Sequence, residues 1–82
     1  QEKHLPVIKV DGDLVTVTVS TVGHPMAEEH SIQWIYLETD CGGQRHALKP
    51  GDKPEATFAL GGAKPVAAYA YCNLHGLWKT EL

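Results

Sequence analysis

Two residues near the carboxyl end of the chain have types and spacing that could bind a metal. Cys72 lies three residues before His75 in the stretch YCNLHG, residues 71–76. Thiolate and imidazole are common protein ligands of zinc, copper and iron. A Cys-x-x-His pair also arises by chance, so the remaining ligands must be sought elsewhere in the chain.

Histidine is unusually abundant, with five residues in 82, and four of the five fall outside the segments that we expect to form strands. These four are His4, His24, His30 and His75. Loops from different strands gather at the ends of a β-sandwich, so side chains in them can converge. The four histidines and Cys72 are therefore candidate metal ligands, although solvated loop histidines would give the same pattern. His46 falls inside an expected strand and stands apart.

The donor types narrow the choice of metal without deciding it. Structural zinc usually takes four ligands, commonly with several thiolates, whereas this set offers five. Iron accepts five or six ligands, and an open sixth position suits small-molecule chemistry. Blue copper is a rival because it uses two His, one Cys and a weak Met. The only methionine, Met26, lies far upstream of Cys72 and close to His24.

The elements that must position these residues are short β-strands separated by turns. Residues 14–20 (LVTVTVS) alternate valine with polar residues, which predicts a half-buried strand. The turn DGD at 11–13 predicts a hairpin between this strand and residues 6–10. Residues 32–39 (IQWIYLET) are apolar on both faces, which is typical of a central strand. Further strands are expected over residues 44–48, 55–60, 66–71 and 77–82, with turns at 41–43 and 49–52.

About seven short strands and no convincing helical stripe predict an all-β fold, an antiparallel sandwich or barrel. Trp34 in the third expected strand resembles the core tryptophan of immunoglobulin-like sandwiches. Both cysteines follow Trp34, however, so the Cys…Trp…Cys order of antibody domains is absent. A single disulfide between Cys41 and Cys72 remains open at this point.

Length and composition predict one small domain over residues 1–82. A domain of this size is marginally stable without a metal, a disulfide or a partner subunit. The formal charge is −3, with no block of like charges, which gives no electrostatic support for nucleic-acid or anionic-membrane binding. No apolar run is long enough to span a bilayer. The chain starts with Gln1, so we expect it to have been cut from a longer one.

Four stretches in order resemble one family, the iron-binding domain of desulfoferrodoxin and neelaredoxin, the superoxide reductases. They are EKHLPVI at 2–8, GHPMAEEHSIQWIYL at 23–37, LKPGDKPEATF at 48–58 and YCNLHGLWKTEL at 71–82. CNLHG alone is a weak signal. The series EKH-x-P, HPM…EH, CN-x-HG and LWK is highly specific and extends over more than half of the chain.

The resemblance implies an immunoglobulin-like antiparallel β-sandwich with one non-haem iron. By motif, His4, His24, His30 and His75 would be the equatorial ligands and Cys72 the axial thiolate, with an open sixth position. The implied activity is reduction of superoxide to hydrogen peroxide with one electron and two protons. The implied electron donor is rubredoxin or a similar small redox protein. A copper electron-transfer protein of cupredoxin type, or a non-catalytic binding module that is metal-free or held by zinc, is the alternative.

The resemblance also assigns roles to two residues beside His4. Lys3 would attract superoxide and assist protonation, and Glu2 would occupy the sixth position in the ferric resting state. Cys41 matches no motif of the family and is expected to be a free thiol beside a turn. The resemblance further implies a homo-oligomer, a dimer or tetramer, in the cytoplasm, with export left open because the chain starts with Gln1. The N-terminal rubredoxin-like domain of some members is not expected in this chain.

Overall fold

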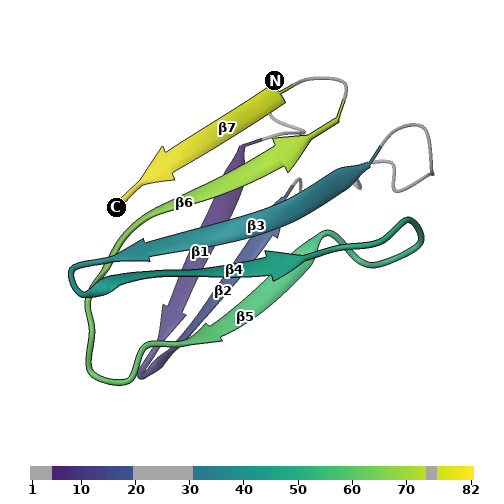
Figure 1. The fold of residues 1–82 in the computed structure, drawn as a ribbon. Helices are drawn as coiled ribbons and strands as arrows, with labels where there is room; N and C mark the ends of the chain where they lie inside the picture. The colour runs from purple at the N-terminus through teal and green to yellow at the C-terminus, as the bar shows by residue number, and fades with distance from the viewer. Residues whose placement is uncertain (1–4, 20–30, 74–75) are drawn as a thin grey trace.

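The computed structural model describes residues 5–19, 31–73 and 76–82, and these residues form seven β-strands and no helix. Figure 1 shows their arrangement. The strands are β1 (Pro6–Asp11), β2 (Leu14–Val19), β3 (Ile32–Thr39), β4 (Gly42–Ala47), β5 (Glu55–Ala59), β6 (Pro65–Cys72) and β7 (Gly76–Glu81). The prediction of an all-β chain with about seven strands is confirmed.

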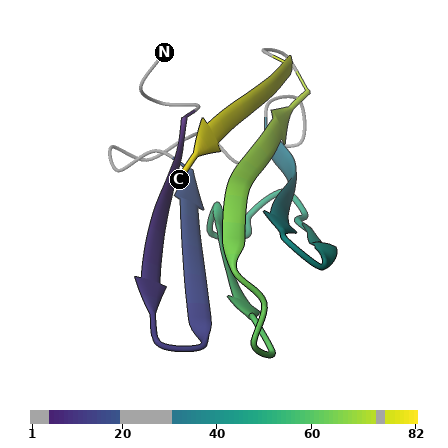
Figure 2. The ribbon, with the colours of Figure 1, turned by 90° about the vertical axis from the view of Figure 1, so that its left-hand side faces the viewer.

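The strands form two antiparallel sheets packed face to face. One sheet has the order β1-β2-β5 and the other the order β4-β3-β6-β7. Figure 2 shows β1 and β2 in one layer and β6 in the other. The predicted hairpin between the first two strands is present, with Pro6 paired to Val19 and Asp11 to Leu14. The fold is therefore the antiparallel β-sandwich that the sequence predicted.

The core lies between the two sheets and follows the alternation of the strands. Val15, Val17 and Val19 on β2 are fully buried, as their spacing predicted. Ile32, Ile35 and Leu37 on β3 face them from the other sheet. The core is completed by Ala56 and Phe58 from β5 and by Ala68, Ala70 and Cys72 from β6.

Strand β3 is central in its sheet, as predicted, but Trp34 does not occupy the core position of the immunoglobulin-like tryptophan that it resembles in sequence. Ile35 and Leu37 point into the core, so Trp34 and Tyr36 alternate onto the outer face of the sheet. Trp34 stacks there on Tyr71, with ring centroids 5.7 Å apart. This tryptophan therefore belongs to an outer aromatic surface and not to the core.

The turn between β3 and β4 lies earlier than expected, at Asp40 and Cys41, because Thr39 closes it. The Thr39 hydroxyl donates to the Gly42 carbonyl oxygen at 3.0 Å and accepts from the Cys41 N–H at 3.3 Å. Gly42, at φ +131°, then opens the return strand in a conformation that L side chains rarely adopt.

Cys41 and Cys72 are both free and lie at opposite ends of β3. Cys41 follows the last residue of β3, whereas Cys72 pairs with the first, Ile32. An eight-residue strand spans about 25 Å, which is far beyond the reach of a disulfide. The bridge between these cysteines that the composition left open does not form.

The part of the chain that the structure describes contains no helix that could cross a lipid bilayer.

Candidate metal centre

Five strand ends gather at the end of the sandwich opposite the β1–β2 and β3–β4 turns (Figure 1). The antiparallel registers place the start of β1 beside the end of β2, and the start of β3 and of β7 beside the end of β6. Each predicted metal ligand is attached in the sequence to one of these ends. His4 precedes β1, His24 follows β2, His30 precedes β3, Cys72 closes β6 and His75 precedes β7.

Cys72 is the one predicted ligand that the structure describes. Its side chain is fully buried as the last residue of β6, and it pairs in register with Ile32 on one side and Gly76 on the other. A free buried cysteine can serve simply as a small apolar side chain. Its place is the last position of β6, beside the first residues of β3 and β7.

Reciprocal hydrogen bonds join the residue after Cys72 to the residue after His30. The backbone N–H of Asn73 donates to the Ser31 carbonyl oxygen at 3.2 Å. The Ser31 N–H donates to Asn73 Oδ1 at 3.0 Å. Ser31 is buried, so these bonds satisfy polar groups that water does not reach. Two of the predicted metal-binding segments are thus fixed to each other at their described ends.

A second bond fixes the start of β1 to the other sheet. The Thr80 hydroxyl on β7 donates to the Pro6 carbonyl oxygen at 2.7 Å. Pro6 is itself buried, although it has no N–H to donate to the sheet. The chain beyond Leu5, which carries His4 in the sequence, therefore leaves a strand that is anchored to both sheets.

The remaining predicted site residues lie outside the described residues. They are Glu2, Lys3, His4, His24, His30 and His75. Among the residues that are described, no group of three His, Cys, Asp or Glu side chains is placed to hold a metal. His46 is exposed on the edge strand β4, which β3 separates from β6 and Cys72.

Cys41 is exposed at the distal turn beside Asp40. A hydrogen bond to the Asp40 carboxylate, together with its negative charge, raises the pKa of the Cys41 thiol. Asp40 Oδ1 also accepts from the Lys64 N–H at 2.9 Å, and this bond, followed by the one from Cys41, lowers the pKa of Asp40. Cys41 is thus a free, protonated thiol remote from Cys72, which agrees with its expected lack of a site role.

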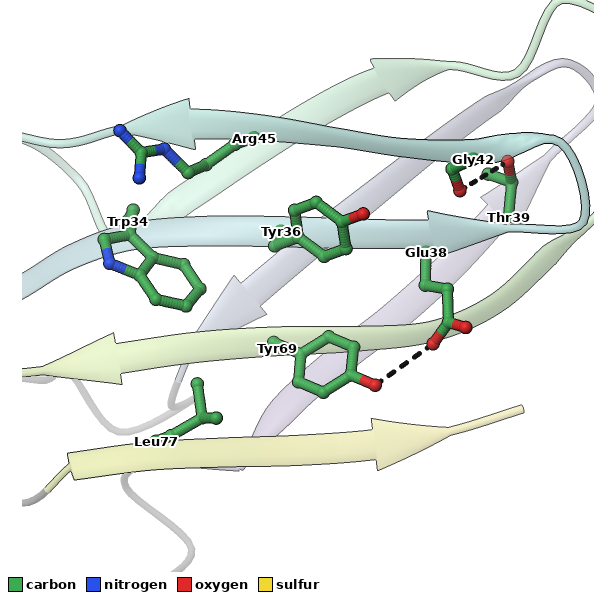
Figure 3. A pocket seen from close by; sticks show the side chains of 8 residues that line it. All are labelled: Trp34, Tyr36, Glu38, Thr39, Gly42, Arg45, Tyr69 and Leu77. Carbon is green, nitrogen blue, oxygen red and sulfur yellow. Dashed lines mark hydrogen bonds between the residues drawn. The ribbon is translucent and has the colours of Figure 1, made fainter.

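The sequence reasoning missed a groove on the outer face of the four-stranded sheet. It has a volume of 530 Å³ and is lined by Trp34, Tyr36, Glu38, Thr39, Gly42, Arg45, Tyr69 and Leu77. Figure 3 shows these side chains on the outer face of the sheet. The signal was present in the sequence, because Trp34, Tyr36 and Glu38 occupy alternate positions opposite the buried Ile35 and Leu37.

The fold and the strand ends define an antiparallel β-sandwich with a buried thiol at the end where β1, β3 and β7 begin and β2 and β6 end. A family model described as desulfoferrodoxin matches residues 1–81. The chain is 51% identical over 81 residues to the desulfoferrodoxin of Syntrophotalea carbinolica, which covers 99% of the chain and 64% of that relative. The chain thus spans less than two thirds of that relative's length.

Solved structures agree. The superoxide reductase of Treponema pallidum superposes with a TM-score of 0.92 at 46% identity, covering 98% of this chain and 66% of that one. The superoxide reductase (1Fe-SOR) of Giardia intestinalis superposes with a TM-score of 0.78 at 37% identity and covers both chains completely. This chain belongs to the desulfoferrodoxin family.

Proposed function

We propose that this chain is the iron-binding catalytic domain of a superoxide reductase, which reduces superoxide to hydrogen peroxide with one electron and two protons. Membership of the desulfoferrodoxin family supports this activity. Some proteins that this chain matches over most of their length carry the name superoxide reductase. Among them are proteins of Pyrococcus horikoshii and Giardia intestinalis.

One observation carries the proposal: five strand ends meet at one end of the sandwich, and each predicted donor is attached to one of them. Strands that are far apart in the sequence, from β1 to β7, thereby share the end next to which these residues stand in the sequence. A chance scatter of loop histidines would distribute them over both ends. The hydrogen bonds between Ser31 and Asn73 add that two of these strand ends are bonded to each other.

The donor set fits iron. Cys72 is fully buried with no disulfide, and it would bind iron as a thiolate whose buried charge the metal compensates. Four imidazoles and one thiolate suit a metal of five or six coordination better than structural zinc with four. We assign His4, His24, His30 and His75 with Cys72 as its ligands. Iron in this set would supply one-electron reduction at its open position.

Two residues outside the described part would handle charge and protons. The chain has a formal charge of −3, so attraction of anionic superoxide must come from a local cation. Lys3, next to His4 in the sequence, is our candidate for that cation and for assisting proton delivery. Glu2 is our candidate for a carboxylate that occupies the sixth position of the oxidised, resting protein and helps to displace the product.

The family indicates the substrate, whereas the electron donor and the oligomeric state are our own proposals. Superoxide as substrate agrees with the family, and a rubredoxin-like protein is our proposed electron donor. A homo-oligomer, dimer or tetramer, and a cytoplasmic location stay predictions, as does the single-domain organisation over residues 1–82.

Metal analysis with an optical spectrum of the purified protein tests this proposal. We expect one iron per chain and a visible charge-transfer band from the Cys72 thiolate to ferric iron. An intense blue colour with bound copper would instead indicate a cupredoxin-like carrier. A colourless protein that keeps its fold after chelation would indicate a binding module, and either result would refute the iron assignment.

A further inference from the structure

The outer face of the four-stranded sheet is built in rows that cross the strands. In the register, Ala47, Trp34, Tyr71 and Leu77 form the row nearest the end where Cys72 lies. Arg45, Tyr36, Tyr69 and Lys79 form the next row. The first row is apolar and aromatic, and the second places a cation at each side of two tyrosines. The 530 Å³ groove lies over these rows.

The floor of the groove is held rigid by ring contacts. Trp34 and Tyr71 are stacked with an interplanar angle of 11°. Tyr36 and Tyr69 meet edge to face with centroids 5.9 Å apart. A side chain at Gly43 would collide with the Tyr36 ring, so the tyrosine lies across that glycine. Rigid aromatic side chains lose little conformational entropy when a partner binds to them.

Each charged side chain on this face, except Arg45, makes a hydrogen bond or an ion pair with another described residue. The Tyr69 hydroxyl donates to Glu38 Oε1 at 3.0 Å. Lys79 Nζ lies 3.1 Å from Glu81 Oε2, and the hydrogen bond to this carboxylate, followed by that to Tyr69, raises the pKa of Lys79. Arg45 lines the groove and has no carboxylate partner among the described residues. Figure 3 shows its side chain extended along β4 towards the strand end where Trp34 lies.

We propose that this groove is where the electron donor docks, and that the donor is an acidic one-electron carrier protein whose free carboxylates pair with Arg45 while an apolar side chain covers Trp34 and Leu77. This inference rests on the proposed function, because it assumes a redox centre at Cys72. Aromatic residues and arginine are the types enriched at energetically important contact points. Leu77 is 57% exposed, so an apolar surface remains to be covered.

The groove is also connected to Cys72, the proposed iron ligand, by a short path of ring contact and covalent bonds. Trp34 lies in the groove and stacks on Tyr71, and Tyr71 is bonded directly to Cys72. A donor seated on Trp34 would thus be separated from the sulfur by one ring stack and one peptide unit. In the transfer, the reduced carrier loses one electron and the ferric centre gains it.

Charge complementarity favours such a partner over a second copy of this chain. The carboxylates of the same face, Glu38 and Glu81, are already engaged by Tyr69 and Lys79. A second copy placed face to face would therefore offer Arg45 only carboxylates that already make these contacts. An acidic partner would provide a free carboxylate without breaking either interaction.

Titration calorimetry of the iron-loaded protein with oxidised rubredoxin as the probe tests this docking site. Arg45→Glu is the test variant, and Lys9→Glu, at an exposed position on β1 in the other sheet, changes the net charge equally. We expect Arg45→Glu to weaken binding about tenfold at low salt, with the difference shrinking as salt rises. We expect Lys9→Glu to bind within about twofold of the wild type, because screening weakens charges remote from the contact.

Stopped-flow reduction of the ferric protein adds a second readout. Trp34→Leu should slow reduction by rubredoxin and leave reduction by dithionite, a small reductant, unchanged. Equal weakening by Arg45→Glu and Lys9→Glu, or no weakening by either, would overturn the docking site. The docking site would also be overturned if sedimentation showed the wild type as an oligomer and Arg45→Glu as a monomer. That result would assign this face to the interface with a second copy. Peroxide formation by chemically reduced protein would still test the proposed function separately.

Discussion

Asn73 and Ser31 hold each other through reciprocal hydrogen bonds, N–H to carbonyl at 3.2 Å and N–H to Oδ1 at 3.0 Å. Asn73 follows the buried Cys72, and Ser31 follows His30 in the sequence. The pair therefore links the described ends of two segments that supply proposed metal ligands. Neither residue is itself a proposed ligand, so the pair can be altered without removing a donor.

Asn73→Ala should destabilise the fold and weaken iron binding. The substitution leaves the N–H of the buried Ser31 without its acceptor, which costs about 1–3 kcal/mol. Urea unfolding of the metal-free protein measures the first effect, and iron retention against a chelator measures the second. Asn73→Asp keeps an acceptor oxygen in the same place and is the matched control. If the alanine variant matches the wild type in both measurements, this pair does not position the site.

Exchange of each cysteine for serine should separate the two thiols. Cys72→Ser removes the proposed axial sulfur, so the visible band and most of the activity should disappear. Cys41→Ser lies at the opposite end of β3 and should change neither. Absorption spectra of the two iron-loaded variants check this prediction. Equal loss of the visible band and of activity in the two variants would argue against the assignment of Cys72 alone as the sulfur ligand.

The thiol of Cys41 should react slowly with alkylating agents near neutral pH. Its pKa is raised by the hydrogen bond to Asp40 and by the charge of that carboxylate, so less thiolate is present at a given pH. Asp40→Asn removes the charge and should lower the thiol pKa, which moves the pH profile of alkylation to lower pH. The rate of iodoacetamide labelling, followed by mass spectrometry in the Cys72→Ser background, measures it. A profile that Asp40→Asn leaves in place would show that Asp40 does not control this thiol.

Lys3→Ala should slow the capture of superoxide while iron stays bound. In a chain with a formal charge of −3, loss of a local cation at the site should lower the second-order rate constant about tenfold at low salt. Pulse radiolysis at several ionic strengths measures this constant. Lys9→Ala, which removes an equal charge from the outer side of β1, should have little effect. A Lys3→Ala rate equal to that of wild type at every ionic strength would remove Lys3 from the mechanism.

The β-sandwich was predictable because alternation of side chains is a local property of a strand. The alternate positions of Val15, Val17 and Val19 predicted a buried face, and all three are fully buried. The face on which Trp34 lies could not be predicted, because β3 has large apolar residues on both faces and only packing against the other sheet decides which face is inside. The position of the β3–β4 turn was missed because it depends on the hydroxyl of Thr39, a contact that composition does not reveal.

Some features of the candidate site could likewise be predicted from the sequence, and others could not. The proposed donor residues were identified from their types and from the family resemblance, since each motif is a short continuous stretch. The tie between Ser31 and Asn73 links residues 42 positions apart and depends on where β3 begins and β6 ends. The groove at Trp34 and Arg45 likewise requires neighbouring strands in a known order. Both needed the three-dimensional structure.

The most direct test of the account is the product formed when the iron-loaded protein consumes superoxide anaerobically in the presence of a reductant. We predict one hydrogen peroxide for each superoxide consumed and no dioxygen formed, with Cys72→Ser inactive. Release of one dioxygen for every two superoxides would identify a dismutation, and failure to accelerate superoxide loss would leave no catalysis to explain. Either result would contradict the proposed reduction at Cys72 and the four histidines.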